Sequence, residues 1–328
     1  MNWRDRITLY REAAAKAADC TVKFQSPDGG YIWAGYVSNA YHKQVYSWPI
    51  AGRYGEAQRL LSWAKKNTLQ SDGQLKDYRG DVYKLAWFVQ GAQKAGRFDL
   101  SYPLMSFLLS CQAPCGGFPR YAADKMIRSV STAWMGISAL CFGKLDVAEN
   151  VAQCCISMLK QQPREDRFYC HMTLDGNLVT GQLDPKVLFI DISKPKQNYY
   201  EVGLPMMLMC RLHQATGNPS YLDYAKRFFE FNLRCCDDKH AYVFSGKTAM
   251  ASAVYYSITG DERAKDAAYR FCDFLLETQL PDGSWRDEVT DPDELLYYVD
   301  HAAEYIVWLL EIAAIMESKE TLDSAGQR

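Results

Sequence analysis

Four short stretches of this chain repeat one pattern: a glutamine, a short polar turn, a glycine and then, in three of them, an aromatic residue. They read QSPDGGY at 25–31, QSDGQL at 70–75, QAPCGGF at 112–118 and QLPDGSW at 279–285. The first three turns place their glycines at positions 29, 73 and 116, which are 44 and 43 residues apart. Recurrence at a fixed period is the sequence signature of a repeat architecture.

A second recurring element is a glycine that follows one helical run and precedes a new amphipathic helix. It occurs in AGRYGEAQRLLSWA from Ala51, AGRFDLSYPLMSFL from Ala95, FGKLDVAENVAQCC from Phe142, TGNPSYLDYAKRFF from Thr216 and TGDERAKDAAYRFC from Thr259. Glycine tolerates the left-handed conformation that ends many helices. The repeating unit is therefore a helix, a Gln–Gly turn, a second helix and a glycine turn.

Six such helix pairs account for the chain. The first helices are expected near 5–24, 54–68, 99–111, 145–162, 219–235 and 261–279, and the second helices near 38–50, 78–95, 128–142, 198–215, 246–258 and 293–316. The second helices are apolar nearly all round, which is typical of buried helices, whereas the first helices carry charge on one face. We therefore predict an all-α fold, an (α/α)6 barrel (toroid) of six outer/inner helix pairs, with residues 1–328 as a single domain.

The fourth pair is interrupted by an insertion at about 163–197. Its segment KVLFIDI at 186–192 is the clearest candidate for a short strand. Long connections within compact folds are often functional, so the insertion is a candidate lid over the barrel mouth.

Composition excludes several classes of function. Lys and Arg total 37 against 39 Asp and Glu, and a net charge of −2 gives no electrostatic reason to expect a nucleic-acid partner. The eleven cysteines lack a paired CxxC arrangement, which favours reduced thiols in an intracellular chain. The sequence contains neither a signal peptide nor the ~18 consecutive apolar residues of a spanning helix, so we expect a cytoplasmic protein without a membrane span.

The segment FCDFLLETQLPDGSW at 271–285 resembles the QW repeat of terpenoid cyclases and protein prenyltransferases, which reads aromatic-Leu, three residues, Gln, a short turn and Gly-x-Trp. The matching positions are Phe274, Leu275, Gln279, Gly283 and Trp285, and, in a second copy, Phe107, Leu108, Gln112, Gly116 and Phe118. The resemblance covers most of the chain and implies a toroid. It also implies that the glutamine caps backbone at the end of an outer helix and that the aromatic residue stacks against the next helix.

The catalytic signatures of that family are incomplete in this chain. Where prenyltransferases carry the zinc-binding Asp-x-Cys, this sequence has Ala249 and Ala251, although His301 stands at a plausible place for the third ligand. We therefore expect no metal and no cofactor. The nearest match to the proton-donating Asp-x-Asp-Asp of terpenoid cyclases is Asp291-Pro-Asp293-Glu294, for which a helix cap is the favoured interpretation. Both interpretations stay open.

The N-termini of the inner helices are expected to meet at one mouth, where helix dipoles favour anions. Residues just after each turn are polar or aromatic for such apolar helices. As general acids or bases we predict His42, Asp81, Glu201 and His301. As substrate-binding side chains we predict Tyr41, Trp48, Tyr78, Tyr83, Trp87, Arg120, Tyr121, Arg128, Tyr199, Tyr200, Lys247 and Tyr297.

Each of these residues also has a plainer interpretation. A histidine at a helix start is often a capped surface residue, and tyrosines and tryptophans at helical spacing often belong to the core. Glu201 could complete a capping box with Asn198. The recurrence of titratable groups at the same position in several repeats is what favours a small-molecule site.

Three functions fit these features. The first is a cofactor-independent cyclase or isomerase that closes a ring on a hydrophobic terpenoid or polyketide by acid/base catalysis. The second is an intracellular carbohydrate-active enzyme, namely a glycan hydrolase, lyase or epimerase, because (α/α)6 barrels also serve these activities. The third is a non-catalytic module that binds a small molecule or a partner. The expected partner is a hydrophobic small molecule, and the oligomeric state stays open.

Overall fold

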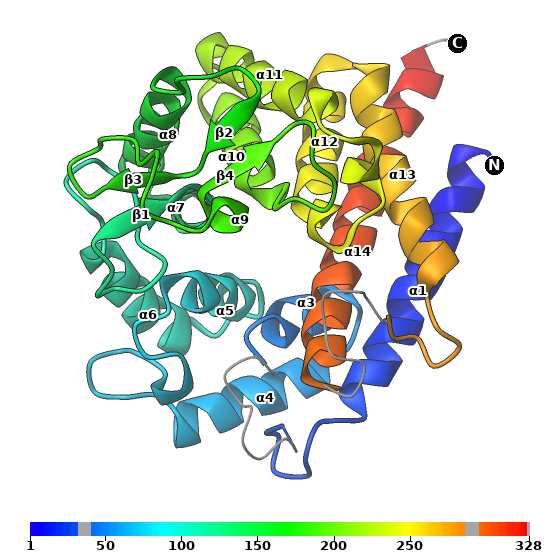
Figure 1. The fold of residues 1–328 in the computed structure, drawn as a ribbon. Helices are drawn as coiled ribbons and strands as arrows, with labels where there is room; N and C mark the ends of the chain where they lie inside the picture. The colour runs from blue at the N-terminus through cyan, green and yellow to red at the C-terminus, as the bar shows by residue number, and fades with distance from the viewer. Residues whose placement is uncertain (32–40, 286–294, 327–328) are drawn as a thin grey trace. The chain divides into compact units, whose positions relative to one another are not determined.

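The computed structural model describes residues 1–31, 41–285 and 295–326 (Figure 1). Each helix expected from the sequence is present among them. The first helices of the pairs are α1 (Trp3–Val22), α4 (Tyr54–Asn67), α6 (Phe98–Ser110), α8 (Leu145–Lys160), α11 (Pro219–Arg234) and α13 (Glu262–Thr278). The second helices are α3 (Gln44–Ile50), α5 (Val82–Lys94), α7 (Ser129–Cys141), α10 (Tyr200–Thr216), α12 (Gly246–Thr259) and α14 (Leu295–Gly326).

Three helix boundaries differ from expectation. Helix α3 begins at Gln44 rather than near 38, and α5 begins at Val82 because a 3-10 turn, η1 (Lys76–Tyr78), precedes it. The side chain of Asp81 caps α5 by accepting a hydrogen bond from the backbone N–H of Lys84 at 3.0 Å. Helix α14 continues to Gly326, well past the expected end at 316.

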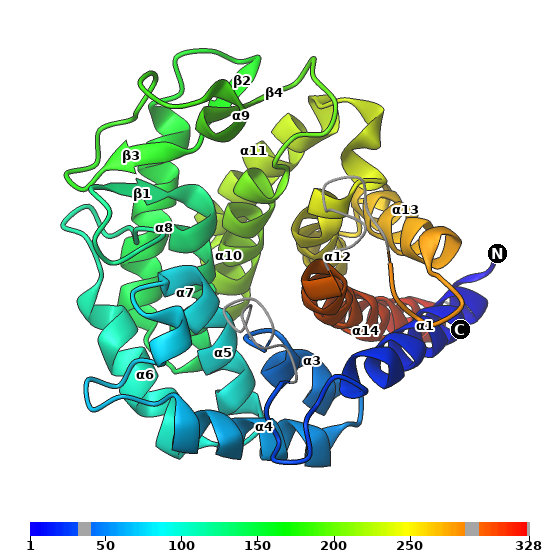
Figure 2. The same ribbon diagram turned by 60° about the horizontal axis from the view of Figure 1, so that its bottom comes forward.

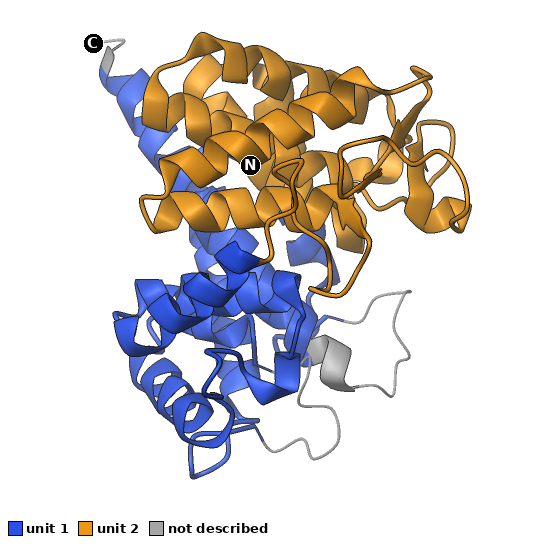
Figure 3. Cartoon of the chain, turned by 90° about the vertical axis from the view of Figure 1, so that its left-hand side faces the viewer, with its two compact units in different colours: residues 1–110, 272–328 blue, residues 111–271 orange. Residues whose placement is uncertain are grey.

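The chain divides into two compact units (Figure 3). Unit 1 comprises residues 1–110 and 272–328, and unit 2 comprises residues 111–271. Within unit 1, α3 lies beside α5 and α14, and in unit 2, α10 lies beside α7 and α12 (Figure 2). That residues 1–328 form a single domain stays a prediction.

First helices pack on the second helix of the preceding pair. In unit 1, α4 packs on α3, α6 on α5, and α1, the first helix of the chain, on α14, the last. In unit 2, α8 packs on α7 and α11 on α10. The glycine turns that join consecutive pairs produce this arrangement, because a short connection brings the next helix back along its neighbour.

Helix α11 shows how the sequence specifies one of these first helices. It begins after Asn218, whose side chain accepts a hydrogen bond from the backbone N–H of Ser220 at 3.0 Å, and Pro219 occupies the first helical position. The preceding helix ends at Gly217, which has a φ of 70°. The buried residues of α11 recur at helical spacing and therefore form one buried face: Tyr221, Ala225, Phe228, Phe229 and Asn232.

The Gln–Gly turns behave as the resemblance implies. In three of them the glutamine donates from Nε2 to the carbonyl oxygen of the turn glycine: Gln25 to Gly29 at 3.0 Å, Gln112 to Gly116 at 2.9 Å and Gln279 to Gly283 at 3.1 Å. Trp285 donates from Nε1 to the carbonyl oxygen of Leu275 and meets the ring of Tyr305 in α14 edge-on at 5.2 Å.

In the fourth helix pair the turn lies at Asp175-Gly176, and its glutamine is one that the sequence analysis did not identify. Gln161, at the end of α8, donates to the carbonyl oxygen of Gly176 at 2.9 Å across the insertion. Gln70 differs from the others, because its amide donates to the carbonyl oxygen of Thr68 in its own segment. The same hydrogen bond from glutamine to glycine therefore forms even where many more residues separate the two.

The turn glycines occupy backbone conformations that other residues rarely adopt. Positions 29, 73, 116, 176 and 283 have φ values between 82° and 97°. A Cβ atom at Gly29 would lie 2.6 Å from the carbonyl oxygen of Arg59 in α4, and one at Gly116 would lie 2.6 Å from that of Asn150 in α8. The turns at Gly29 and Gly116 thus lie directly against the backbone of the next first helix.

The insertion at 163–197 contains most of the strands. In one antiparallel pair β1 (Met126–Arg128) lies beside β3 (His171–Thr173), and in the other β2 (Arg167–Tyr169) lies beside β4 (Phe189–Asp191). The strand expected at 186–192 is shorter than predicted, because residues 185–188 form a single helical turn, α9 (Pro185–Leu188). Between α11 and α12, the helices of the fifth pair, the chain forms two 3-10 turns, η2 (Asp237–His240) and η3 (Val243–Ser245).

Candidate functional site

The predicted site residues lie at or near the N-terminal ends of second helices. Asp81 caps α5, Arg128 precedes α7, Tyr199 to Glu201 begin α10, and Lys247 is the second residue of α12. Helix N-termini carry partial positive charge, so negative groups are stabilised there. Asp291, Asp293 and Glu294 lie outside the described residues, and of Tyr297 only the helical backbone is described.

In unit 1 the structure assembles a buried polar group that we call the Lys43 cluster, comprising His42, Lys43, Asp300 and Glu304. Lys43 Nζ lies 2.7 Å from Asp300 Oδ2 and 2.6 Å from Glu304 Oε2. His42 Nε2 lies 3.6 Å from the other carboxylate oxygen of Asp300. All four residues are at most 9% exposed, so these charges interact with little screening by water.

The charges of this cluster stabilise one another. Burial opposes the charged form of Lys43, but Asp300 and Glu304 outweigh that penalty and raise the pKa of Lys43. Burial also opposes ionisation of Asp300, yet Lys43, His42 and His301 together hold the pKa of Asp300 below its usual value. Asp300 is therefore an ionised carboxylate at neutral pH, next to a histidine.

Aromatic rings surround the Lys43 cluster. The ring of Tyr78 meets that of His42 at 5.5 Å, and the ring of Trp87 lies 5.8 Å from Lys43 Nζ. Trp308 donates from Nε1 to Glu304 Oε1 at 3.1 Å and packs edge-on against Trp87. His301 is half-buried, with its ring 6.0 Å from that of Tyr305. Two of the four predicted acid/base residues, His42 and His301, thus lower the pKa of the same carboxylate, that of Asp300.

Other predicted residues of unit 1 have structural surroundings. Trp48 is fully buried, donates from Nε1 to Thr21 Oγ1 at 2.9 Å and stacks on Tyr31. Tyr41 is also fully buried and donates from its hydroxyl to Asp77 at 3.0 Å. These contacts favour core packing over substrate binding for both residues. Tyr83 is half-exposed and close enough to Lys43 to affect its pKa.

Unit 2 holds a second group, the Arg128 cluster, comprising Arg128, His171, Tyr200, Glu201 and Lys247. Arg128 forms an ion pair of 2.5 Å with Glu201 Oε1 and lies opposite His171 in the β1–β3 ladder. The ring of Tyr200 lies between two cations, 5.8 Å from the guanidinium of Arg128 and 5.5 Å from Lys247 Nζ. Such a ring favours positive charge at its faces.

Glu201 is fully buried and committed to structural contacts. Besides Arg128 it accepts hydrogen bonds from Ser129 Oγ at 2.5 Å and from the backbone N–H of Val130 at 3.1 Å. The expected capping box with Asn198 is not formed, because the amide of Asn198 donates to the carbonyl oxygen of Lys186. This arrangement favours a positioning role for Glu201 over that of a general base, because both of its carboxylate oxygens already accept hydrogen bonds.

The electrostatics of the Arg128 cluster follow from burial and pairing. Burial disfavours the charged form of Arg128, but Glu201 outweighs that effect and raises the pKa of Arg128. Burial lowers the pKa of His171, with Glu201 opposing and Arg128 assisting that shift. His171 is therefore a neutral imidazole at pH 7.

The remaining predicted residues of unit 2 lie in other surroundings. Tyr199 is buried, and its hydroxyl donates to Asp238 at 2.9 Å. Tyr121 is 47% exposed, with the guanidinium of Arg120 stacked over its ring at 5.4 Å.

Two residues of the clusters were missed by sequence reasoning. Lys43 follows His42 directly and gave no signal, because its partners Asp300 and Glu304 come from the far end of the chain. His171 lies in the insertion, and only the pairing of β1 with β3 brings it opposite Arg128. Asp300 and Glu304 were recognisable as polar residues at the start of an apolar helix, but not as the counter-ions of a lysine.

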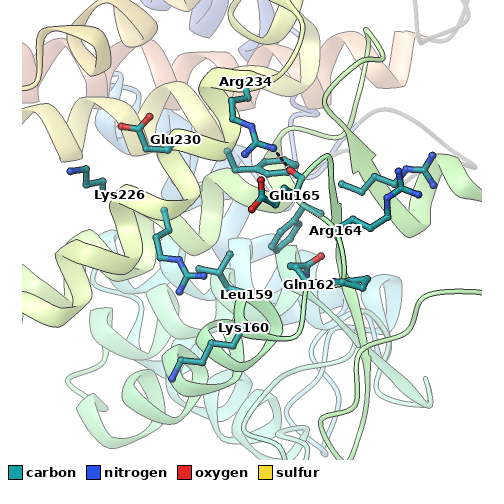
Figure 4. A pocket seen from close by; sticks show the side chains of 13 residues that line it. Leu159, Lys160, Gln162, Arg164, Glu165, Lys226, Glu230 and Arg234 are labelled. Atoms are coloured by element: carbon teal, nitrogen blue, oxygen red, sulfur yellow. Dashed lines mark hydrogen bonds between the residues drawn. The ribbon is translucent and has the colours of Figure 1, made fainter.

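Unit 2 also carries an open groove of about 580 Å³ between the end of α8, the start of the insertion and α11 (Figure 4). Six basic side chains line it, Lys160, Arg164, Arg167, Lys226, Arg227 and Arg234, against the acidic Glu165 and Glu230. Arg164 is paired with Asp166, and Arg234 donates to the carbonyl oxygen of Glu165. None of the catalytic or substrate-binding residues predicted from the sequence lines this groove.

No group of three or more His, Cys, Asp or Glu side chains in the described ranges is arranged to hold a metal ion. Among the helices that the structure describes, none combines the length and apolarity needed to cross a membrane.

Comparison of the sequence with known protein families and with curated proteins finds no match. Solved structures, in contrast, match over nearly the whole chain. A D-mannose isomerase superimposes with a TM-score of 0.66 at 15% identity, covering 92% of this chain and 97% of that one. An α-1,6-mannanase from Salegentibacter sp. gives 0.65 at 12% identity, covering 94% and 99%. The type II terpene cyclase MstE from Scytonema gives 0.63 at 12% identity, covering 95% and 99%.

These structures are (α/α)6 toroids, so the predicted fold class is confirmed: the chain is all-α with an (α/α)6 fold. The resemblance to terpenoid cyclases holds at the level of the fold, which that family shares with carbohydrate-active enzymes. Such identities carry no further conclusion about chemistry.

Proposed function

We propose that this chain is a cofactor-independent isomerase that transfers a proton between neighbouring carbons of a sugar-like substrate at the Lys43 cluster. The observation that carries the proposal is the contact of His42 with the ionised Asp300, which is itself paired with Lys43. A histidine next to a fixed carboxylate is suited to accept and return a proton near neutral pH. Two of the similar structures, a mannose isomerase and a mannanase, belong to enzymes of sugars.

The proposed reaction uses each member of the cluster. His42 removes the proton from the carbon next to a carbonyl group, and the electron pair moves to the carbonyl oxygen, giving an enediolate. Asp300 stabilises the imidazolium that forms. Lys43 donates two of its three N–H bonds to Asp300 and Glu304, which leaves one for the enediolate oxygen. The isomerisation is complete when the hydroxyl proton passes from the oxygen of the neighbouring carbon to the enediolate oxygen, with His301 as the second acid/base group, and His42 returns the first proton to the former carbonyl carbon.

A ring-closing cyclase on a hydrophobic substrate is the second candidate. The aromatic rings of Tyr46, Trp87 and Trp308 and the similarity to a terpene cyclase favour it. Protonation of an alkene, however, requires a carboxylic acid, and Lys43 holds Asp300 in its ionised form. The polar, charged surroundings of His42 therefore fit an oxygen-rich substrate better than a hydrocarbon.

The proposal is tested by incubating the protein with a panel of aldoses and ketoses, mannose and fructose among them, in D2O. Proton transfer through a histidine exchanges with solvent, so we expect deuterium at the carbon next to the carbonyl, detected by NMR. Replacing His42 by Asn should abolish both exchange and product, whereas His213→Asn, at a half-buried position in the last turn of α10, should leave them unchanged.

Two results would overturn the proposal. One is an H42N variant that exchanges deuterium as fast as the wild type. The other is the absence of exchange with every sugar, together with ring closure of a prenylated aromatic acid by the same preparation. That second outcome would restore the cyclase hypothesis.

A further inference from the structure

One Gln–Gly turn carries a cysteine where the others carry an aspartate. The residue before the turn glycine is Asp28, Asp72, Asp175 or Asp282 in four turns and Cys115 in the remaining one. In three of the aspartate turns the carboxylate accepts a hydrogen bond from the backbone N–H two residues on: Asp28 from Gly30, Asp72 from Gln74 and Asp282 from Ser284, at 3.0–3.1 Å. This position of the turn therefore accommodates a negatively charged acceptor.

The structure gives Cys115 similar surroundings. The Cys154 thiol, 3.9 Å away, is the main cause of a fall in the pKa of Cys115 to about 6, burial opposes that fall, and the backbone N–H of Gly117 assists it. Gly117 stands two residues after Cys115, as the donors do in the aspartate turns. Of the titratable groups nearby, Asp175 raises the pKa of Cys115. Cys155 resists ionisation itself, because burial raises its own pKa.

Cys115 and Cys154 form an asymmetric pair. Cys115 is half-exposed in the turn, whereas Cys154 is 2% exposed on the inward face of α8. Their sulfurs are in non-bonded contact, and a disulfide needs an S–S distance of about 2.05 Å. Both cysteines are free in this structure.

We propose that Cys115 and Cys154 are a redox-active pair in which Cys115 reacts first with a hydroperoxide and Cys154 resolves it as a disulfide. The Cys115 thiolate attacks the peroxide oxygen, the O–O bond breaks, and a sulfenic acid and hydroxide form. The Cys154 sulfur then displaces the sulfenic oxygen, which leaves as water. The pair loses two electrons, which reduce one peroxide, and a thiol reductant reverses the reaction.

The first test is a disulfide map of the wild-type protein after treatment with hydrogen peroxide. Trypsin releases Cys115 on peptide 98–120 with Cys111, and Cys154 on peptide 145–160 with Cys155, so fragmentation must identify the linked residues. We expect a Cys115–Cys154 link that dithiothreitol removes. The C155S variant should retain it, and the C154S variant should lose it.

The second test identifies which sulfur reacts first. In C154S the sulfenic acid has no resolving partner, so dimedone should label Cys115. In the wild type at pH 7, limiting iodoacetamide should modify Cys115 before Cys141, an exposed cysteine at the end of α7. Preferential labelling of Cys141, a link that involves Cys111 or Cys155, or no disulfide after complete consumption of the peroxide would each overturn the proposal.

Discussion

The side chains of Lys43 and Asp300, 257 positions apart in the sequence, form a buried ion pair of 2.7 Å in unit 1. Glu304, one turn further along α14, accepts from the same ammonium group. A single lysine therefore links the segment before α3 to the first part of the last helix. Because the three charges are buried, the free energy of unfolding depends on keeping them matched.

Replacing Lys43 by Met should destabilise the protein by about 3–5 kcal/mol at pH 7, because two buried carboxylates lose their counter-ion. The loss of stability in K43M relative to the wild type should become smaller as the pH falls. In the wild type the pKa of Asp300 is depressed, so the stability it contributes is present above its unfolded pKa and is lost as the pH falls through the folded value. In the variant Asp300 loses the ammonium group that lowers its pKa while burial still raises it, so Asp300 becomes neutral at a higher pH than in the wild type.

Urea unfolding of K43M and wild type at pH 7 and pH 5 measures this difference. The matched control is Lys65→Met, which removes a partly exposed pair with Asp99 and should cost less than about 1 kcal/mol at either pH. Equal losses in the two variants would show that the Lys43 cluster contributes no more than a surface ion pair.

A comparison of Gly29 with Gly52 distinguishes two reasons for glycine at a turn, a positive φ and the close approach of another backbone segment. Both have positive φ, 97° and 77°, so alanine at either position should cost about 1–2 kcal/mol in backbone strain. At Gly29 a Cβ would also lie 2.6 Å from the carbonyl oxygen of Arg59, whereas at Gly52 nothing lies within 4 Å. Thermal or urea unfolding should therefore show a loss for G29A that exceeds that of G52A by about 1–3 kcal/mol. Equal losses would mean that α4 moves aside at little cost.

The glutamine caps are testable in the same manner. Gln279 donates from Nε2 to Gly283 in its own turn and to Ala13 in α1, so Q279A should cost about 1–3 kcal/mol from the loss of both hydrogen bonds. Gln70 is exposed and donates only to the nearby Thr68, and Q70A should cost less than about 1 kcal/mol. Urea unfolding of the two variants under identical conditions checks the ranking, which a larger loss in Q70A would contradict.

The helices could be predicted from the sequence because their signals are local. Glycines with positive φ end α10 at Gly217 and α12 at Gly260. Gln25, Gln112 and Gln279 are each followed four residues later by a turn glycine. Where the local signal is interrupted, prediction failed. Gln161 caps Gly176 across fifteen residues, and no short motif relates them.

The sites were less predictable because their contacts are long-range. The sequence indicated His42 and His301, but Lys43 becomes recognisable as a site residue only when α14 places Asp300 and Glu304 beside it. Glu201 looked like a base because an acid at the start of an apolar helix is unusual. Its three hydrogen-bonding partners, Arg128 among them, come from the end of β1 and the start of α7, some seventy residues earlier in the chain.

His240 provides a pH-dependent test of burial in unit 2. Burial, assisted by Lys239 and Arg270 and opposed by Asp237, lowers the pKa of His240 to about 3. Between its unfolded pKa of about 6.5 and this value, only the unfolded chain takes up the proton, so His240 makes folding less favourable as the pH falls. H240Q should therefore lose less stability than the wild type between pH 7 and pH 4, by an amount on the order of several kcal/mol. His213→Gln, at a half-buried position, tests whether any histidine would give this result, and parallel pH profiles for H240Q and wild type would contradict the prediction.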